Sequence, residues 1–283
     1  PGQVATVELI AQPSKHAQPI GRVAEVLGNY TDPGMEIEIA LRKFDLPNEF
    51  SKKSLAAARA MPEEVRAEDL KDRRDLRDVP FVTIDGETAK DFDDAVHALR
   101  DGKGFRLRVA IADVSHYVRP GDALDADARE RGTSVYFPRR VIPMLPEKLS
   151  NGLCSLNPDV DRLAMVCDMA IAPDGKVTRY EFYPAVFRSK ARLTYTAVWE
   201  MISKEKANQE INTLYEVYKA LSQERSRRGA IDFETVETKM VFDDKGKILR
   251  IVPEPRNEAH RLIEECMLAA NVCAGNFLSE GKH

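Results

Sequence analysis

The most reactive part of the sequence is a short acidic segment in which Asp85, Asp91, Asp93 and Asp94 fall within ten residues. Apolar runs with β-strand composition flank this segment, so folding should bring the four carboxylates close together. Two carboxylates about 5 Å apart repel each other by roughly 3 kcal/mol at an effective dielectric constant near 20. The cluster is therefore unfavourable unless protons or cations compensate its charge.

The donor atoms of this segment indicate the kind of cation. All are hard carboxylate oxygens, which favours Mg²⁺, or Mn²⁺ as an alternative, over zinc. Mg²⁺ keeps several waters and binds a few carboxylates together with substrate phosphates, an arrangement that serves phosphodiester hydrolysis. The alternatives are an exposed acidic loop or caps for a following turn. The sequence contains none of four common motifs, namely the EF-hand spacing, the P-loop, HExxH and GxSxG.

A second feature combines aromatic and basic side chains. Tyr136 and Phe137 lie between Arg131 and the pair Arg139-Arg140. Aromatic rings stack on unpaired bases, and arginines hold the phosphates between them. Further basic groups are Arg188, Lys190, Arg192, Arg225, Arg227 and Arg228. Each group alone is also compatible with an ordinary solvated surface. Together with the acidic segment they indicate a channel that leads RNA or DNA to a hydrolytic centre.

The composition excludes some classes of protein. The 283 residues contain 42 Lys plus Arg and 46 Asp plus Glu, a net charge of −4, which excludes a wholly basic protein. No apolar run is long enough for a membrane span and no signal peptide is visible, so we expect a cytoplasmic protein. The four cysteines lack zinc-site spacing and should be reduced, buried thiols. The first residue is Pro1, and we expect a piece of a longer protein.

The elements that must position these residues change in kind along the chain. Residues 1–45 predict three short strands, at Val4–Ile10, Ile20–Leu27 and Met35–Leu41, which would form part of a small barrel. Residues 46–79 predict a charged, partly helical connector, which we interpret as a solvated linker.

Residues 80–283 predict an α+β domain, a mixed sheet of β-hairpins with surrounding helices. The predicted strands are Phe81–Ile84 and three hairpins over residues 95–114, 163–187 and 240–252. The predicted helices are Asp122–Arg131, Tyr195–Ile202, 211–221 and a long one that Asn257 opens. In the first hairpin Phe105, Leu107, Val109 and Ile111 should share one face, and Arg106 and Arg108 the other.

Some polar residues have no clear role in these patterns. His97, His116 and His260 show no paired spacing with Asp or Cys, and we interpret them as structural or exposed. Glu264 and Glu265 lie inside an otherwise apolar helix. One of them could face a polar cavity, and surface exposure fits the periodicity equally well.

Several of these segments together resemble the ribonuclease II/R (RNB) family of 3′→5′ exoribonucleases. The similar segments include Val82–Gly86, Asp91–Ala95, Val109–Ser115, Gly132–Pro138, Ile142–Glu147, Leu149–Leu156 and Ile263–Met267. The resemblance covers essentially the whole chain. It implies that residues 1–45 are the later part of a cold-shock OB barrel and that residues 80–283 begin the catalytic domain.

The resemblance also implies an activity and a site. The activity is processive, magnesium-dependent hydrolysis of single-stranded RNA from a free 3′ end to nucleoside 5′-monophosphates, in RNA turnover and quality control. Asp85, Asp91, Asp93 and Asp94 would form the magnesium site, with Asp93 most essential for cleavage. Tyr136 would stack on the terminal base with Phe233 as its aromatic partner. Tyr195 and Glu265 would set the RNA path and the recognition of its end.

The chain also departs from the family pattern. The family's catalytic domain continues beyond this sequence and contains a further arginine and an S1 barrel, and its first cold-shock barrel is absent here. We therefore expect a monomeric parent enzyme of which this piece alone is inactive. The alternative function is a fragment that binds single-stranded RNA without cutting it. A metal phosphatase for small substrates would leave Tyr136, Phe233 and the basic groups unexplained.

Overall fold

The computed structural model describes residues 2–231, 236–244 and 246–281, which form two compact units. Unit 1 comprises Pro1–Ser51, Asp127–Met144 and Val236–Glu254. Unit 2 comprises Lys52–Ala126, Leu145–Thr235 and Pro255–His283. Each unit is described by itself.

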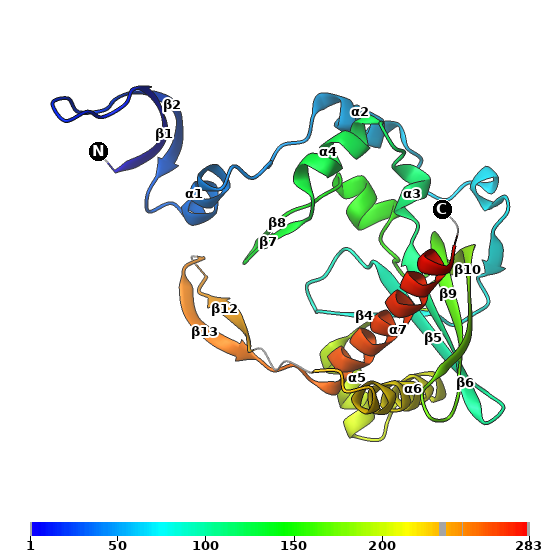
Figure 1. Cartoon of the computed structure of the whole chain (residues 1–283). Helices are drawn as coiled ribbons and strands as arrows, with labels where there is room; N and C mark the ends of the chain where they lie inside the picture. The colour runs from blue at the N-terminus through cyan, green and yellow to red at the C-terminus, as the bar shows by residue number, and fades with distance from the viewer. Residues whose placement is uncertain (1, 232–235, 245, 282–283) are drawn as a thin grey trace. The chain divides into compact units, whose positions relative to one another are not determined.

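Unit 2 is built on a seven-stranded mixed sheet in the order β11-β4-β5-β6-β9-β10-β3 (Figure 1). Its strands are β3 (Arg74–Leu76), β4 (Val82–Asp85), β5 (Asp94–Asp101), β6 (Gly104–Ala112), β9 (Asp161–Ile171), β10 (Val177–Arg188) and β11 (Ala191–Thr194). The central strands are antiparallel, and the two edge strands β11 and β3 run parallel to their neighbours. The predicted strand and the two hairpins of this sheet are confirmed.

Three helices pack on one face of this sheet: α5 (Tyr195–Ser203), α6 (Gln209–Arg227) and α7 (Glu258–Glu280) (Figure 1). Leu107 and Val109 of β6 and Leu214 and Leu262 of the helices are at most 1% exposed. Burying one such side chain contributes about 1.5–3 kcal/mol, so this layer is a main source of stability. The predicted inward face of β6 is confirmed.

The predicted helix ends are confirmed where a side chain or a glycine defines them. The Thr194 hydroxyl accepts a hydrogen bond from the Ala197 amide at 3.1 Å and begins α5. The Asn257 side chain accepts one from the Ala259 amide at 2.9 Å and begins α7. Helix α4 (Ala123–Arg131) ends at Gly132, whose φ of +72° favours glycine.

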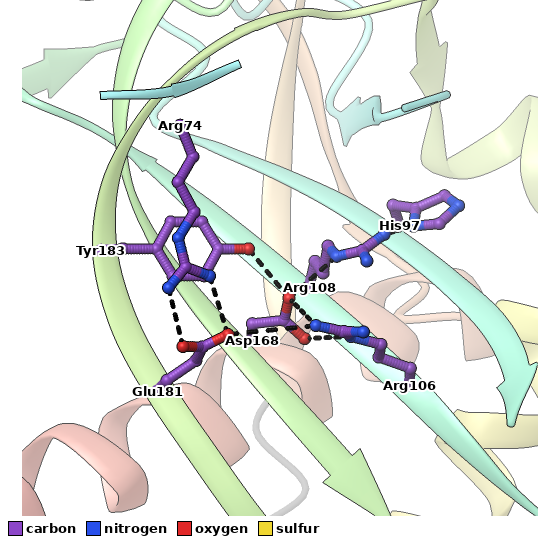
Figure 2. Close-up of polar contacts among 7 residues, drawn as sticks. All are labelled: Arg74, His97, Arg106, Arg108, Asp168, Glu181 and Tyr183. Carbon is purple, nitrogen blue, oxygen red and sulfur yellow. Dashed lines mark hydrogen bonds and ion pairs between the residues drawn. The ribbon is translucent and has the colours of Figure 1, made fainter. Parts of the chain in front are cut away.

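The opposite face of the sheet carries a network of charged side chains around Asp168 of β9 (Figure 2). Arg106 Nε and Arg108 Nε, both from β6, lie 2.7 and 2.9 Å from its two carboxylate oxygens. The Tyr183 hydroxyl donates a third bond at 2.8 Å. The two arginines do lie on the face predicted for them, but they pair with carboxylates instead of facing solvent alone.

The charged segment before this sheet is more ordered than a solvated linker. It contains α2 (Lys52–Ala60), the 3₁₀ helix η1 (Ala67–Leu70) and strand β3. Ser54 and Ala58 are buried, and β3 pairs in parallel with β10. Arg74 of β3 binds Glu181 of β10 at 2.8 Å and stacks on the Tyr183 ring. Because its charges find partners on β10, a charge-rich sequence forms an edge strand here.

Two short helices, α3 (Val114–Tyr117) and η2 (Lys148–Leu153), complete unit 2.

Among its described residues, unit 1 contains three two-stranded sheets and one complete helix. The pairs are β1 (Gln3–Ala11) with β2 (Ile20–Asn29), β7 (Val135–Phe137) with β8 (Arg140–Ile142), and β12 (Glu237–Phe242) with β13 (Ile248–Glu254). The first two predicted strands and the hairpin over 240–252 are confirmed.

The predicted third strand at Met35–Leu41 is wrong, because this segment belongs to helix α1 (Met35–Lys43). In the helix Glu38 and Arg42 form an i,i+4 ion pair, and Arg42 also binds Glu25 of β2 at 2.9 Å. Met35 and Leu41 become buried. The apolar–acidic alternation that suggested a strand is short enough to fit a helix equally well.

The four cysteines Cys154, Cys167, Cys266 and Cys273 are free and buried, as predicted. Burial raises the pKa of the Cys154 thiol to about 12. None of the helices among the described residues is long and apolar enough to cross a membrane.

Candidate active site

The four aspartates lie where strands β4 and β5 leave the sheet. Asp85 is the last residue of β4 and Asp94 the first of β5, and the loop that joins these neighbouring strands carries Asp91 and Asp93. The Ala89 amide donates to the Gly86 carbonyl at 3.2 Å and turns the loop. The chain therefore turns directly after β4. This turn explains how residues up to nine positions apart in sequence reach one region.

The carboxylates influence one another. Burial is the main cause that raises the pKa values of Asp85, Asp93 and Asp94, and repulsion between the aspartates adds to it. The pKa of Asp94 rises to about 6. Asp93 is accessible to solvent, but the surrounding protein still raises its pKa. The region therefore holds more negative charge than its own protein groups neutralise.

The chemistry of this region fits a hard divalent cation. Asp94 Oδ2 is buried and has no hydrogen-bond partner among the described residues. All four side chains offer carboxylate oxygens, the donors that Mg²⁺ and Mn²⁺ prefer. In the described part of the chain, however, no three His, Cys, Asp or Glu side chains already stand close enough to hold a metal ion. The donor atoms suit Mg²⁺ or Mn²⁺, but the side chains would have to rotate before they could bind such an ion together.

Tyr195 lies beside this cluster. It is the first residue of α5, and Thr194 before it pairs in register with Asp85. Its ring stacks on the His260 imidazole at 4.0 Å with an interplanar angle of 20°. Burial raises the pKa of Tyr195, and the charges of Asp85 and Asp94 add to this effect. His260 is thus more than a remote structural histidine, because it supports the ring predicted to contact RNA.

The two glutamates of α7 have different surroundings. Glu265 is buried, and Arg225 Nε of α6 lies 2.7 Å from its carboxylate. Glu264 is more exposed and accepts a bond from Arg256 Nε at 2.9 Å. Burial raises the pKa of Cys266, and the charges of Asp94 and Glu265 raise it further. Cys266 therefore lies within electrostatic reach of Asp94.

The other two predicted RNA contacts are Tyr136 and Phe233. Tyr136 belongs to β7 of unit 1, and its side chain is 64% exposed. Phe233 lies outside the described residues. The four aspartates, Tyr195 and Glu265 all belong to unit 2.

Two residues that touch the acidic loop were not predicted as part of the site. The buried hydroxyl of Ser155 bonds the main chain at Lys90 and Phe92, and Arg192 Nη2 bonds the carbonyls of Glu87 and Ala89. Arg192 was noted among the basic groups as an RNA contact or a surface residue. Nothing in the sequence pattern distinguished Ser155, because its partners are 63 and 65 positions away.

Comparison with known proteins decides the family. The model of the RNB domain matches residues 73–283. The chain belongs to the RNB family. A second model, the cold shock domain, matches residues 1–51 of the chain. Both results agree with the resemblance inferred from the motifs and with the order of a cold-shock part before the RNB domain.

Similar proteins carry the name Ribonuclease R. The chain is 49% identical to Ribonuclease R of Escherichia coli over 99% of the chain and 36% of that protein. It spans about a third of the length of several such relatives. Mycoplasma genitalium RNase R in complex with double-stranded RNA superimposes with a TM-score of 0.90 at 30% identity, over 95% of this chain and 49% of that one. The same enzyme with ribose methylated single-stranded RNA gives 0.89 at 31% identity, over 95% and 43%.

Proposed function

We propose that this chain carries the acidic centre of a magnesium-dependent 3′→5′ exoribonuclease, which hydrolyses single-stranded RNA to nucleoside 5′-monophosphates. The observation that supports this most strongly is the set of four aspartates at the end of β4, the start of β5 and the loop between them. Asp85, Asp93 and Asp94 have raised pKa values, and Asp94 Oδ2 is buried with no hydrogen-bond partner among the described residues. Membership of the RNB family and similarity to Ribonuclease R give the reaction class.

Asp85, Asp91, Asp93 and Asp94 would hold the cation. Bound Mg²⁺ would supply activation of the attacking water and stabilisation of the leaving oxygen. The protein's own part is to bring four carboxyl groups into one region, where a bound cation would favour their ionised form. The phosphate would approach from the side of the solvent-accessible Asp93.

The RNA would be held by stacking and by polar contacts. We assign base stacking to the exposed ring of Tyr136 and to Phe233, and contacts with the RNA end to Tyr195 and Glu265. Stacking is tolerant of sequence because every base has a π-face, which suits an enzyme of RNA turnover and quality control. The RNA complexes of the Mycoplasma genitalium relative support an RNA substrate.

A second function is binding of single-stranded RNA without cleavage. It is favoured by one observation: the described residues hold no ready-made group of three metal ligands. Under this hypothesis Tyr136 and the basic groups act and the aspartates do not.

Replacing Asp93 by Asn in the full-length protein tests the proposal. We expect RNA cleavage to fall by at least about 100-fold, because one carboxylate of the cation site becomes neutral, while RNA affinity stays within about threefold. A single-stranded oligonucleotide labelled at its 5′ end reports shortening from the 3′ end, with and without EDTA. Asp101→Asn, at the exposed far end of β5, is the control. Cleavage that survives both EDTA and Asp93→Asn would exclude the proposed chemistry.

A further inference from the structure

The sheet holds the two ends of the acidic loop, where Asp85 pairs with Thr194 of β11 and Asp94 with Ile111 of β6, but β4 and β5 do not hold the loop between them. Strands β4 and β5 pair in register only at Val82 and Val96, so their ladder ends well before Asp85 and Asp94. The carbonyl of Asp93 accepts a bond from the Ala112 amide at 2.9 Å, and that of Phe92 accepts one from the Leu156 amide at 2.8 Å. The segment between Asp85 and Phe92 must be held by other groups.

Ser155 supplies the buried part of this support. Its hydroxyl is fully buried, accepts a hydrogen bond from the Phe92 amide at 3.0 Å and donates one to the Lys90 carbonyl at 2.9 Å. These two bonds span Asp91, the residue between them in the chain. A buried amide or carbonyl that loses its partner costs free energy, so the loop is fixed on both sides of Asp91 as long as the hydroxyl is present.

Ser155 is itself held in place. Its carbonyl accepts a bond from Arg162 Nε at 2.7 Å, and Arg162 is buried. From the outside, Arg192 Nη2 donates to the carbonyls of Glu87 and Ala89, both at 3.0 Å, and its guanidinium lies 4.9 Å from the Phe92 ring centre. Buried Ser155 and exposed Arg192 thus fix successive parts of the same loop.

We propose that Ser155 is a positioning residue that holds the loop of Asp91 and Asp93 in the shape needed for cation binding, with Arg192 as an outer clamp. This inference rests on the proposed function. With the main chain fixed, cation binding requires only rotation of the carboxylates. Without the hydroxyl, the loop samples more conformations, and the cation must also order the main chain.

The test measures Mn²⁺ binding to the full-length protein by electron paramagnetic resonance of the free ion. We expect the apparent Kd to rise about fivefold or more in Ser155→Ala. Ser189→Ala is the matched control, because Ser189 is also a buried serine of unit 2, and its hydroxyl donates to the Ala191 carbonyl at 3.2 Å instead of to the main chain of the acidic loop. Its Kd should stay within about twofold of the wild-type value.

Hydrogen exchange gives a second readout that needs no metal. Amides of residues 86–94 should exchange faster in Ser155→Ala than in the wild type, and the same amides in Ser189→Ala should not.

Arg192→Lys tests the outer clamp. It keeps the positive charge but removes the guanidinium that donates through Nη2 to the carbonyls of Glu87 and Ala89, so it should raise the Mn²⁺ Kd by a smaller factor. On RNA, Ser155→Ala should lower kcat and leave KM unchanged.

The outcomes separate the inference from the function on which it rests. Wild-type affinity for Mn²⁺ in Ser155→Ala, together with weakened binding in Asp93→Asn, overturns the role of Ser155 alone. Equal binding in the wild type and Asp93→Asn places the cation elsewhere and overturns the proposed function. A Ser155→Ala protein that does not fold would make the residue a folding element and would also overturn the positioning role.

Discussion

At the scale of single residues, the site is defined by charge that the protein does not neutralise. Asp94 shows this most clearly, because its Oδ2 atom is buried with no hydrogen-bond partner in the described part of the chain and its pKa rises to about 6. Nearby, His260 and Tyr195 stack, and Asn257 Oδ1 lies 2.9 Å from the His260 ring nitrogen Nδ1. One residue therefore both caps α7 and orients the histidine that supports Tyr195.

The raised pKa of Asp94 predicts an unusual pH dependence of stability in EDTA. The pKa of Asp94 is near 3.8 in the unfolded chain and about 6 in the folded protein. As the pH rises from about 4 to about 6, the folded protein therefore becomes less stable, because the unfolded chain loses this proton more easily. Asp94→Asn should therefore stabilise the metal-free, full-length protein at pH 7, by up to roughly 3 kcal/mol, and have little effect at pH 4. Urea unfolding at both pH values measures this difference. The same gain at both pH values, or none at pH 7, would contradict the role of Asp94.

At the scale of elements, strands β6, β9 and β10 are joined by charges on the face opposite the helices (Figure 2). Burial alone would raise the pKa of Asp168, but hydrogen bonds from Arg106, Arg108 and Tyr183 lower it. Burial and the charge of Arg108 lower the pKa of nearby His97 to about 4, so this histidine is neutral at pH 7. A buried carboxylate thus ties together side chains from three adjacent strands.

Asp168→Asn should destabilise the sheet. It leaves Arg108, whose side chain is 13% exposed, without its main partner, and losses of about 3 kcal/mol are typical of a broken buried pair. The lowered pKa of Asp168 means that its contribution is present above pH 4 and is lost as pH falls below that value. The difference between wild type and variant should therefore shrink in acid. Glu181→Gln, whose partner Arg74 is exposed, should cost less than about 1 kcal/mol in the same unfolding assay.

At the scale of the whole molecule, the two units differ in how they are stabilised. Unit 2 has one large sheet covered by three helices, whereas unit 1 has three separate two-stranded sheets. Its β1–β2 pair exposes Val7, Leu9, Ile20 and Val23 by more than half. A two-stranded sheet gains little from packing by itself.

Hydrogen exchange of the chain should report this difference directly. Amides in β1–β2 and β12–β13 should exchange at least about 100-fold faster than those in β5, β6 and β9. The reason is that local opening costs little free energy where few apolar groups are buried. Mass spectrometry of the exchanged peptides measures both sets in one experiment, with the central strands as internal reference. Equal protection in the two sets would show that the hairpins are stabilised as strongly as the large sheet.

The sequence alone determined what depends on neighbours along the chain. Turn residues and alternation located the hairpins of unit 2, Thr194 and Asn257 marked the starts of two helices, and the spacing of the four aspartates predicted that they gather. The segment Met35–Leu41 was misassigned because a short alternation cannot show which hydrogen-bond partners the main chain will find.

Only the tertiary structure decided the pairings between distant residues. It showed that Ser155 and Arg192 hold the acidic loop, that Glu265 rather than Glu264 is the buried one, paired with Arg225, and that Asp168 gathers arginines from a neighbouring strand. Sequence periodicity gives the face on which a side chain lies, but the identity of its partner depends on which strands and helices become neighbours. That order is set by packing of the whole domain, so the supports of the site become visible only in three dimensions.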